Sequence, residues 1–264
     1  MSERGGPTTQ SGIFYQNSIA ALYLGRLCDQ VERSPAQSVV RVRVEAPTAV
    51  DDTVVTFEDG HKTFIQAKEN IRVGEEAWQK IWSDFARQLN DAEFQQGKDR
   101  LLLHCGERSD DLNMLKDMCR RASTMLDPAE MPLRFTEAQQ KLLRKIRPFL
   151  RSSHTTDESL LLLLSHIDVE LYTLDEIERD LVLSWIPESN RKRSELFRLL
   201  RDRVSEEARI RGSLTAEDLR ASLENESGIV VRRQPSVAEL RDHLKMMGKT
   251  QHWDEKSHGF FSNC

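Results

Sequence analysis

The feature that most constrains the fold is a pair of β-rich runs joined by a tight turn. Residues 51–57 and 63–68 are rich in β-branched and aromatic side chains, and the turn signal Asp59-Gly60 lies between them. Side chains alternate across a strand, so residues two apart lie on one face. The runs predict a hairpin whose second strand carries Gln66 and Lys68 on the same face.

Hydrophobic periodicity on both sides of the hairpin predicts an α/β unit. We expect a helix over 11–31, a strand over 40–45 that Pro47 ends, and a helix over 78–89 with a stripe of large apolar residues. The apolar run 100–105 is typical of a central strand covered on both faces. Residues 1–128 are therefore expected to form a mixed sheet flanked by helices.

The sequence texture changes after Pro128. Capping boxes begin at Thr136 and Thr173, helical periodicity follows over 191–209 and 215–223, and only 167–172 suggests a strand. We expect a mainly helical second domain over 129–233. The segment 234–264 is expected to hold one helix, over 237–247, and a tail.

Bulk composition excludes several classes of protein. A net charge of −5 argues against a protein that coats nucleic acid through overall charge. No run approaches the roughly 18 apolar residues of a membrane span, and no secretory signal opens the sequence. The four cysteines are scattered, without zinc-site spacing. These features predict a cytoplasmic protein with reduced thiols and no membrane partner.

The hairpin places two acids opposite Gln66 and Lys68. A two-residue turn at Asp59-Gly60 would put Asp51 on the Lys68 face, whereas a three-residue loop or a bulge would put Asp52 there. Carboxylate and amide oxygens are ligands that Mg²⁺ prefers, and a lysine can position a water or stabilise a pentavalent phosphate. The Ala67 backbone carbonyl could supply a further oxygen. The set fits phosphodiester hydrolysis, while the hairpin alone leaves Asp51 and Asp52 as alternatives.

The complete string of motifs resembles a known family. Phe14-Tyr15-Gln16, Glu45, the run 51–55 and the run 64–68 are similar to the double-stranded-DNA endonuclease domain of bacterial anti-phage effectors. That domain belongs to the Mrr-like branch of the PD-(D/E)xK, or restriction-endonuclease-like, superfamily. It occurs with cyclic-oligonucleotide signalling enzymes (CD-NTases) and with STAND NTPases. The resemblance covers roughly residues 10–125, and Ala67 departs from it, because a larger apolar residue is frequent there.

The resemblance implies a role for each matching residue. Asp52 would be the main metal ligand, with Asp51 as the register-dependent alternative. Gln66 would be the second metal-site residue and Lys68 the catalytic lysine. Glu45 and Gln16 would support the metal or the water. The implied cofactor is Mg²⁺, with Mn²⁺ as a substitute.

These residues together predict a metal-dependent DNA endonuclease of bacterial antiviral defence. The expected partners are double-stranded DNA, a second copy of the chain, and a sensor or NTPase, either separate or in a C-terminal region beyond this sequence. A local basic groove would hold DNA, formed by Arg41, Arg43, Lys62 and Arg72. Two alternatives stay open: a catalytically silent DNA- or protein-binding adaptor on the same fold, and an oligomerisation or sensor protein dominated by 129–233.

Overall fold

The computed structural model describes residues 5–31, 33–150, 156–232, 242 and 245–246. The strands are β1 (Val39–Val44), β2 (Thr53–Phe57), β3 (Lys62–Lys68), β4 (Arg100–Cys105), β5 (Ile167–Leu171) and β6 (Ser213–Thr215). The longer helices are α1 (Gly5–Cys28), α2 (Glu76–Leu89), α3 (Asp110–Ala122), α5 (Glu137–Ile146), α6 (Asp157–Ser165), α9 (Arg193–Ile210) and α10 (Ala216–Ser227). The short helical pieces are η1 (Pro128–Glu130), α4 (Met131–Arg134), η2 (Arg147–Phe149), α7 (Leu174–Glu176), η4 (Ile177–Leu181) and α8 (Val182–Trp185).

The strands form one six-stranded mixed sheet in the order β5-β4-β3-β2-β1-β6. The hairpin β2–β3 and the pairs β1–β2 and β1–β6 are antiparallel, whereas β3–β4 and β4–β5 are parallel. Parallel neighbours need long crossover connections, which α2 and the segment α3–α6 supply. The expected α/β class and mixed sheet are confirmed.

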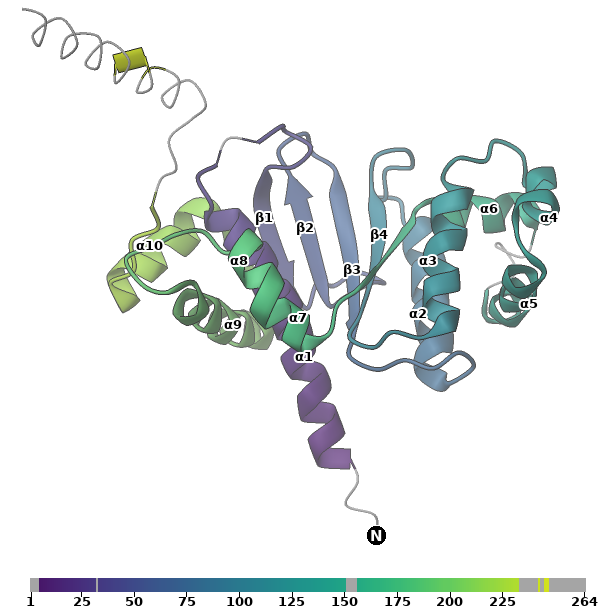
Figure 1. Cartoon of the computed structure of the whole chain (residues 1–264), viewed down its shortest axis with the longest axis horizontal. Helices are drawn as coiled ribbons and strands as arrows, with labels where there is room; N and C mark the ends of the chain where they lie inside the picture. The colour runs from purple at the N-terminus through teal and green to yellow at the C-terminus, as the bar shows by residue number, and fades with distance from the viewer. Residues whose placement is uncertain (1–4, 32, 151–155, 233–241, 243–244, 247–264) are drawn as a thin grey trace, which may run out of the picture.

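Helices cover the two faces of the sheet unequally (Figure 1). The first face packs against α2, α3, α5 and α6, over a core that includes Trp78, Trp82 and Phe85. The second face packs against α1, α8, α9 and α10, over a core that includes Tyr15, Ile65 and Leu200. On the first face the side chains of β1 are exposed, because the helices there lie over the β3–β5 half.

Most of the predicted elements are present, with boundary shifts of a few residues. The helix expected over 11–31 is α1, the stripe beginning at Trp78 is α2, and the apolar run 100–105 is β4. The strand β6 was not expected, and it joins β1 from far along the chain. Both β5 and β6 come from the region predicted as the second domain. The helix expected over 237–247 lies outside the described residues, apart from 242 and 245–246.

The described part of the chain holds no helix both long and apolar enough to cross a membrane. Cys28, Cys105 and Cys119 are free and buried, which confirms the expected reduced thiols for these three, while Cys264 lies outside the described residues. Burial raises the pKa of the Cys28 and Cys105 thiols to about 12.

Candidate functional site

The β2–β3 hairpin decides which aspartate faces Lys68. Phe57 N donates to His61 O and Thr53 pairs with Ile65, so the loop has three residues, 58–60. Gly60 ends this loop with φ 86°, in the left-handed region that glycine tolerates best. One step beyond the Thr53–Ile65 pair, Asp52 lies opposite Gln66. Asp52, and not Asp51, therefore shares the face of Gln66 and Lys68.

The Asp52 carboxylate is the centre of a compact polar cluster. Its Oδ2 atom accepts hydrogen bonds from Gln66 Nε2, from Ala67 N at 2.8 Å and from Lys68 Nζ at 3.3 Å. Asp52 is only 9% exposed. Burial raises the pKa of the Asp52 carboxyl, and the Lys68 ammonium and the Ala67 amide oppose that rise. The acid, the amide and the ammonium that the sequence predicted to meet thus lie together.

Two further predicted residues lie around this cluster. Glu45 follows β1 with φ 47°, and its pKa is raised by desolvation and then by the charges of Asp52 and Asp51. Gln16 Nε2, from α1, donates to Ala67 O at 3.3 Å. The carbonyl that was expected to bind metal therefore already accepts a hydrogen bond from the protein.

The metal-binding capacity of the cluster is limited. The described residues contain no group of three or more His, Cys, Asp or Glu side chains that could hold a metal ion. The one carboxylate at the centre of the cluster uses a single oxygen for three protein donors. Gln66 Oε1 is buried without a hydrogen-bond partner among the described residues. These residues do not fit an ion cage formed by the protein alone, and the expected Mg²⁺ or Mn²⁺ stays a prediction.

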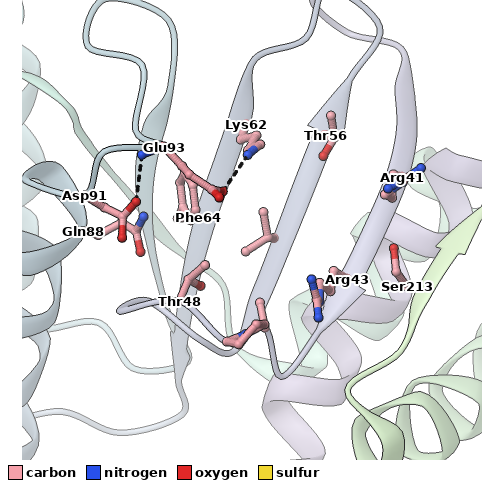
Figure 2. A pocket seen from close by; sticks show the side chains of 13 residues that line it. Arg41, Arg43, Thr48, Thr56, Lys62, Phe64, Gln88, Asp91, Glu93 and Ser213 are labelled. Atoms are coloured by element: carbon pink, nitrogen blue, oxygen red, sulfur yellow. Dashed lines mark hydrogen bonds and ion pairs between the residues drawn. The ribbon is translucent and has the colours of Figure 1, made fainter.

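A basic pocket opens on the same face, over the part of the sheet that the helices leave uncovered (Figure 2). We call it the arginine pocket. Its volume is about 380 Å³. Polar side chains from four strands line it: Arg41 and Arg43 from β1, Thr56 from β2, Lys62 from β3 and Ser213 from β6. The period-two spacing that predicted a strand over 40–45 places both arginines on this face.

The charges of the pocket are only partly balanced by protein groups. Lys62 Nζ lies 3.6 Å from Glu93 Oε2, on a side chain that is 80% exposed, so this ion pair is weak. Asp91 also lines the rim. Hydrogen bonds from Thr215 lower the pKa of the Asp218 carboxyl, and the charge of nearby Arg41 lowers it further. Arg43 forms no ion pair with any described residue, so the pocket keeps cationic groups for a ligand.

The sequence predicted some of the residues that line the arginine pocket and not others. Arg41, Arg43 and Lys62 were expected in a basic groove, and all three line it. Arg72 was expected there too, but it is not a lining residue. Thr56 and Ser213 were missed. Ser213 comes from β6, and a three-residue strand leaves no periodic signal.

Comparisons with known proteins return solved structures only. No family model matches, and no curated protein matches. One similar structure is the Cap4 SAVED/CARF-domain containing receptor of Moraxella osloensis, with 16% identity and a TM-score of 0.47 over 83% of this chain. Another is the Cap4 receptor of Acinetobacter baumannii with the cyclic trinucleotide 3'3'3'-cAAA, with 12% identity and a TM-score of 0.49 over 81% of this chain. The chain spans 48% of the length of either structure.

These findings correct the family and the activity that the sequence predicted. The matched structures are described as SAVED/CARF-domain containing receptors, and none of these descriptions names a PD-(D/E)xK nuclease. The predicted Mg²⁺-dependent endodeoxyribonuclease activity is corrected with the family, because the descriptions are of receptors and no metal-binding group of acids is present among the described residues. The physical reason is that an acid, an amide and a lysine can meet in a polar cluster in which one carboxylate oxygen already accepts three hydrogen bonds from the protein.

Proposed function

We propose that this chain is a binding module that holds the phosphates of double-stranded DNA on the open face of its sheet, without hydrolysing them. One observation carries the proposal: Arg41, Arg43 and Lys62 line a single pocket on the part of the first face that the helices leave uncovered. The proposal takes up the DNA-binding adaptor expected as an alternative from the sequence, and it assigns the DNA contacts to the arginine pocket. A place in bacterial antiviral defence is part of the same proposal.

The chemistry of the arginine pocket suits a phosphate backbone. Guanidinium groups donate two parallel hydrogen bonds to a phosphate, and a lysine adds a point charge. Arg41 and Arg43 lie two residues apart on β1, roughly 6.6 Å along the strand. Thr56 and Ser213 add hydroxyl donors of the kind that contact phosphate and sugar. No base-reading motif accompanies them, so binding should be independent of DNA sequence.

The acidic overall charge sets the strength of this binding. With a net charge of −5, and with Asp91 and Glu93 at the rim, only the local field of the pocket attracts DNA. Non-specific DNA binding at physiological salt typically has dissociation constants of about 10⁻⁴–10⁻⁶ M, and we expect this range. A second copy of the chain would add contacts, and the predicted homo-oligomer belongs to the proposal. So does the predicted sensor or NTPase partner.

A cyclic oligonucleotide is the second candidate ligand. Two of the similar structures are described with a cyclic trinucleotide, 3'3'3'-cAAA or 2'3'3'-cAAA. The pocket of about 380 Å³ falls within the usual range for small-molecule sites. The phosphates of the cyclic trinucleotide would contact Arg41, Arg43 and Lys62, as those of DNA would. Binding of duplex DNA and of the cyclic compound must therefore be compared directly.

The test is fluorescence anisotropy with a labelled short duplex and with labelled cyclic tri-adenylates, over a range of salt. Three phosphate contacts predict a slope of log K against log salt of about −2.7, since each contributes roughly −0.9. The double variant Arg41→Ala/Arg43→Ala should reduce the slope to about −0.9 and weaken binding at least tenfold. Arg198→Ala is the matched control, because Arg198 is an exposed arginine on α9, over the other face.

Each outcome separates the candidates. Duplex binding that depends on Arg41 and Arg43 supports the proposal, and binding of only the cyclic compound supports the second candidate. Equal binding by the double variant and the wild type would refute both. Cleavage of the duplex with Mg²⁺, lost in Lys68→Ala, would refute the assignment of a module without catalysis.

A further inference from the structure

A second pocket lies on the other face of the sheet, between α1, the end of α8 and the β4–β5 edge. We call it the histidine pocket. Its volume is about 250 Å³. Four aromatic side chains line it, Tyr23, His104, Tyr172 and Trp185, together with the acids Asp168 and Glu170. Because Arg41 and Arg43 point to the opposite face, this pocket is separate from the proposed DNA surface.

The imidazole of His104 is the unexplained group in this pocket. His104 is 3% exposed, and neither ring nitrogen has a hydrogen-bond partner among the described residues. Burial lowers the pKa of His104 to about 3, so the ring is neutral at pH 7, with one donor and one acceptor. His166, which is also buried, differs: its Nε2 accepts from Gly97 N and its Nδ1 pairs with Leu162 O. Leaving a buried polar group without a hydrogen bond lowers the stability of the fold. The two His104 nitrogens are therefore candidates to bind a ligand.

The walls of the pocket favour a flat aromatic partner. The Tyr23 and Trp185 rings meet edge to face with centroids 5.2 Å apart. The His104 ring lies 6.4 Å from the Tyr23 ring and 6.4 Å from the Tyr172 ring. Planar π-systems gain from stacked or edge-to-face contact with such rings. A flat ring inserted among these residues would have aromatic neighbours and a polar edge near His104.

The charged groups near the pocket select against an anion. Asp168 and Glu170 lie on β5 beside His104, and both are hydrogen-bond acceptors when ionised. Lys116 Nζ pairs with Glu170 Oε2 at 3.1 Å, and Arg100, which lines the pocket, donates to Ser165 O at 3.0 Å. The Arg26 guanidinium lies over the Trp185 ring, 4.4 Å from its centroid. A ligand with amino or ring N–H donors and no phosphate fits this surrounding best.

We propose that the histidine pocket binds a neutral, planar nitrogen heterocycle of nucleobase size, with its ring among Tyr23, Tyr172 and Trp185 and its polar edge hydrogen-bonded to His104. Amino groups of the heterocycle donate to Asp168 and Glu170. No bond is made or broken. The site is an addition to the proposed DNA surface and does not depend on it.

Adenine and adenosine are the probes for this site, with free ribose as a non-aromatic control. Saturation-transfer NMR and isothermal titration calorimetry on the full chain measure their binding. Adenine should bind, and ribose should not. His104→Phe should weaken adenine binding about tenfold, the loss expected when one hydrogen bond to a buried group is removed. Trp185 is partly exposed, and its ring lines the pocket. Trp185→Leu removes that ring and should weaken adenine binding as well.

The controls keep the two proposals distinguishable. His104→Phe replaces an unpaired polar ring by an apolar ring of similar shape, so the circular dichroism spectrum should be unchanged. Arg43→Ala should leave adenine binding unchanged, since Arg43 lies on the opposite face. The proposal is overturned if neither adenine nor adenosine binds the wild type. Binding at wild-type strength by His104→Phe would also overturn it.

Discussion

Replacing Lys68 by methionine should destabilise the fold in a pH-dependent way. Lys68→Met keeps the length of the side chain and removes the cation 3.3 Å from Asp52 Oδ2. The variant leaves a carboxylate that is 9% exposed without its counter-ion. Breaking a buried ion pair from one side typically costs about 3–5 kcal/mol.

The carboxyl group can limit this cost by taking a proton. At pH 7, protonating a group whose unfolded pKa is about 3.9 costs about 4 kcal/mol, since each pH unit is worth about 1.4 kcal/mol. The donors Gln66 and Ala67 remain in place. We therefore expect Lys68→Met to lower the free energy of unfolding by about 3–4 kcal/mol at pH 7, since protonation limits the cost to about 4 kcal/mol.

The sign of the pH dependence follows from linkage. Burial already raises the folded pKa of Asp52, and losing Lys68 raises it further. Between the unfolded and the folded pKa the native state binds more protons, so stability falls as pH rises through that window. The cost of Lys68→Met should therefore shrink to below about 1 kcal/mol at pH 4.5, near the unfolded pKa.

Urea unfolding followed by circular dichroism at both pH values measures this difference. Lys80→Met is the matched control: Lys80 is 61% exposed, and its partner Asp84 keeps Arg87 at 2.9 Å, so the loss should stay below about 1 kcal/mol. Adding Asp52→Asn to Lys68→Met should recover part of the stability. An equal loss at pH 7 and pH 4.5 would refute the argument that an unpaired carboxylate causes it.

Three further predictions concern metal, histidine and glycine. Mg²⁺ should leave the melting temperature of the free chain unchanged, because a cation that does not bind adds no stability. A rise of several degrees would instead support the metal site predicted at Asp52. His104→Phe should raise the free energy of unfolding by about 1–3 kcal/mol, the cost of a buried unpaired polar group, and a lower value in urea titration would mean that His104 is satisfied. Gly106→Ala should destabilise by about 1–3 kcal/mol, because its Cβ would lie 2.8 Å from Glu69 O. Gly12→Ala, in α1 with no atom within 4 Å, should be neutral or stabilising by up to about 1 kcal/mol, and a similar melting temperature for both alanine variants would contradict the steric argument.

Local patterns predicted the elements whose periodicity is strong. The stripe from Trp78 to Leu89 indicated α2, because a helix with one buried face repeats its apolar residues every three or four positions. The apolar run 100–105 indicated β4, and the alternation over 40–45 indicated β1 with its two arginines. These signals lie within single elements, and the sequence carries them directly.

Features set by distant contacts could not be predicted in the same way. The hairpin left Asp51 and Asp52 as alternatives, and the three-residue loop ending at Gly60 decided between them. The helix α6 is apolar on most of its surface, because it lies inside the core of the first face, so its leucines show no amphipathic period. The strand β6 is recognisable only through its pairing with β1.

At the candidate site, the sequence motifs predicted which residues meet but did not establish what those residues do. The sequence predicted that Asp52, Gln66 and Lys68 would meet, and they lie together. Their meeting does not by itself specify a reaction, because chemistry depends on which atoms remain open to a substrate. Gln16 engages the Ala67 carbonyl, and three donors engage one oxygen of Asp52. Gln16 belongs to the motif string, but its bond to the Ala67 carbonyl, like the bond from Ala67 N to Asp52, is visible only in the three-dimensional structure.

The pairing of β6 with β1, and of β5 with β4, has a practical consequence for anyone who wishes to shorten this protein. A fragment that stops at residue 128 would lack both outer strands. The outer edges of β4 and β1 would then carry unpaired backbone amides and carbonyls, and such edges readily pair with a strand from another molecule. Residues 167–171 and 213–215 thus pair the edges of β4 and β1 and are themselves the outer strands of the complete sheet.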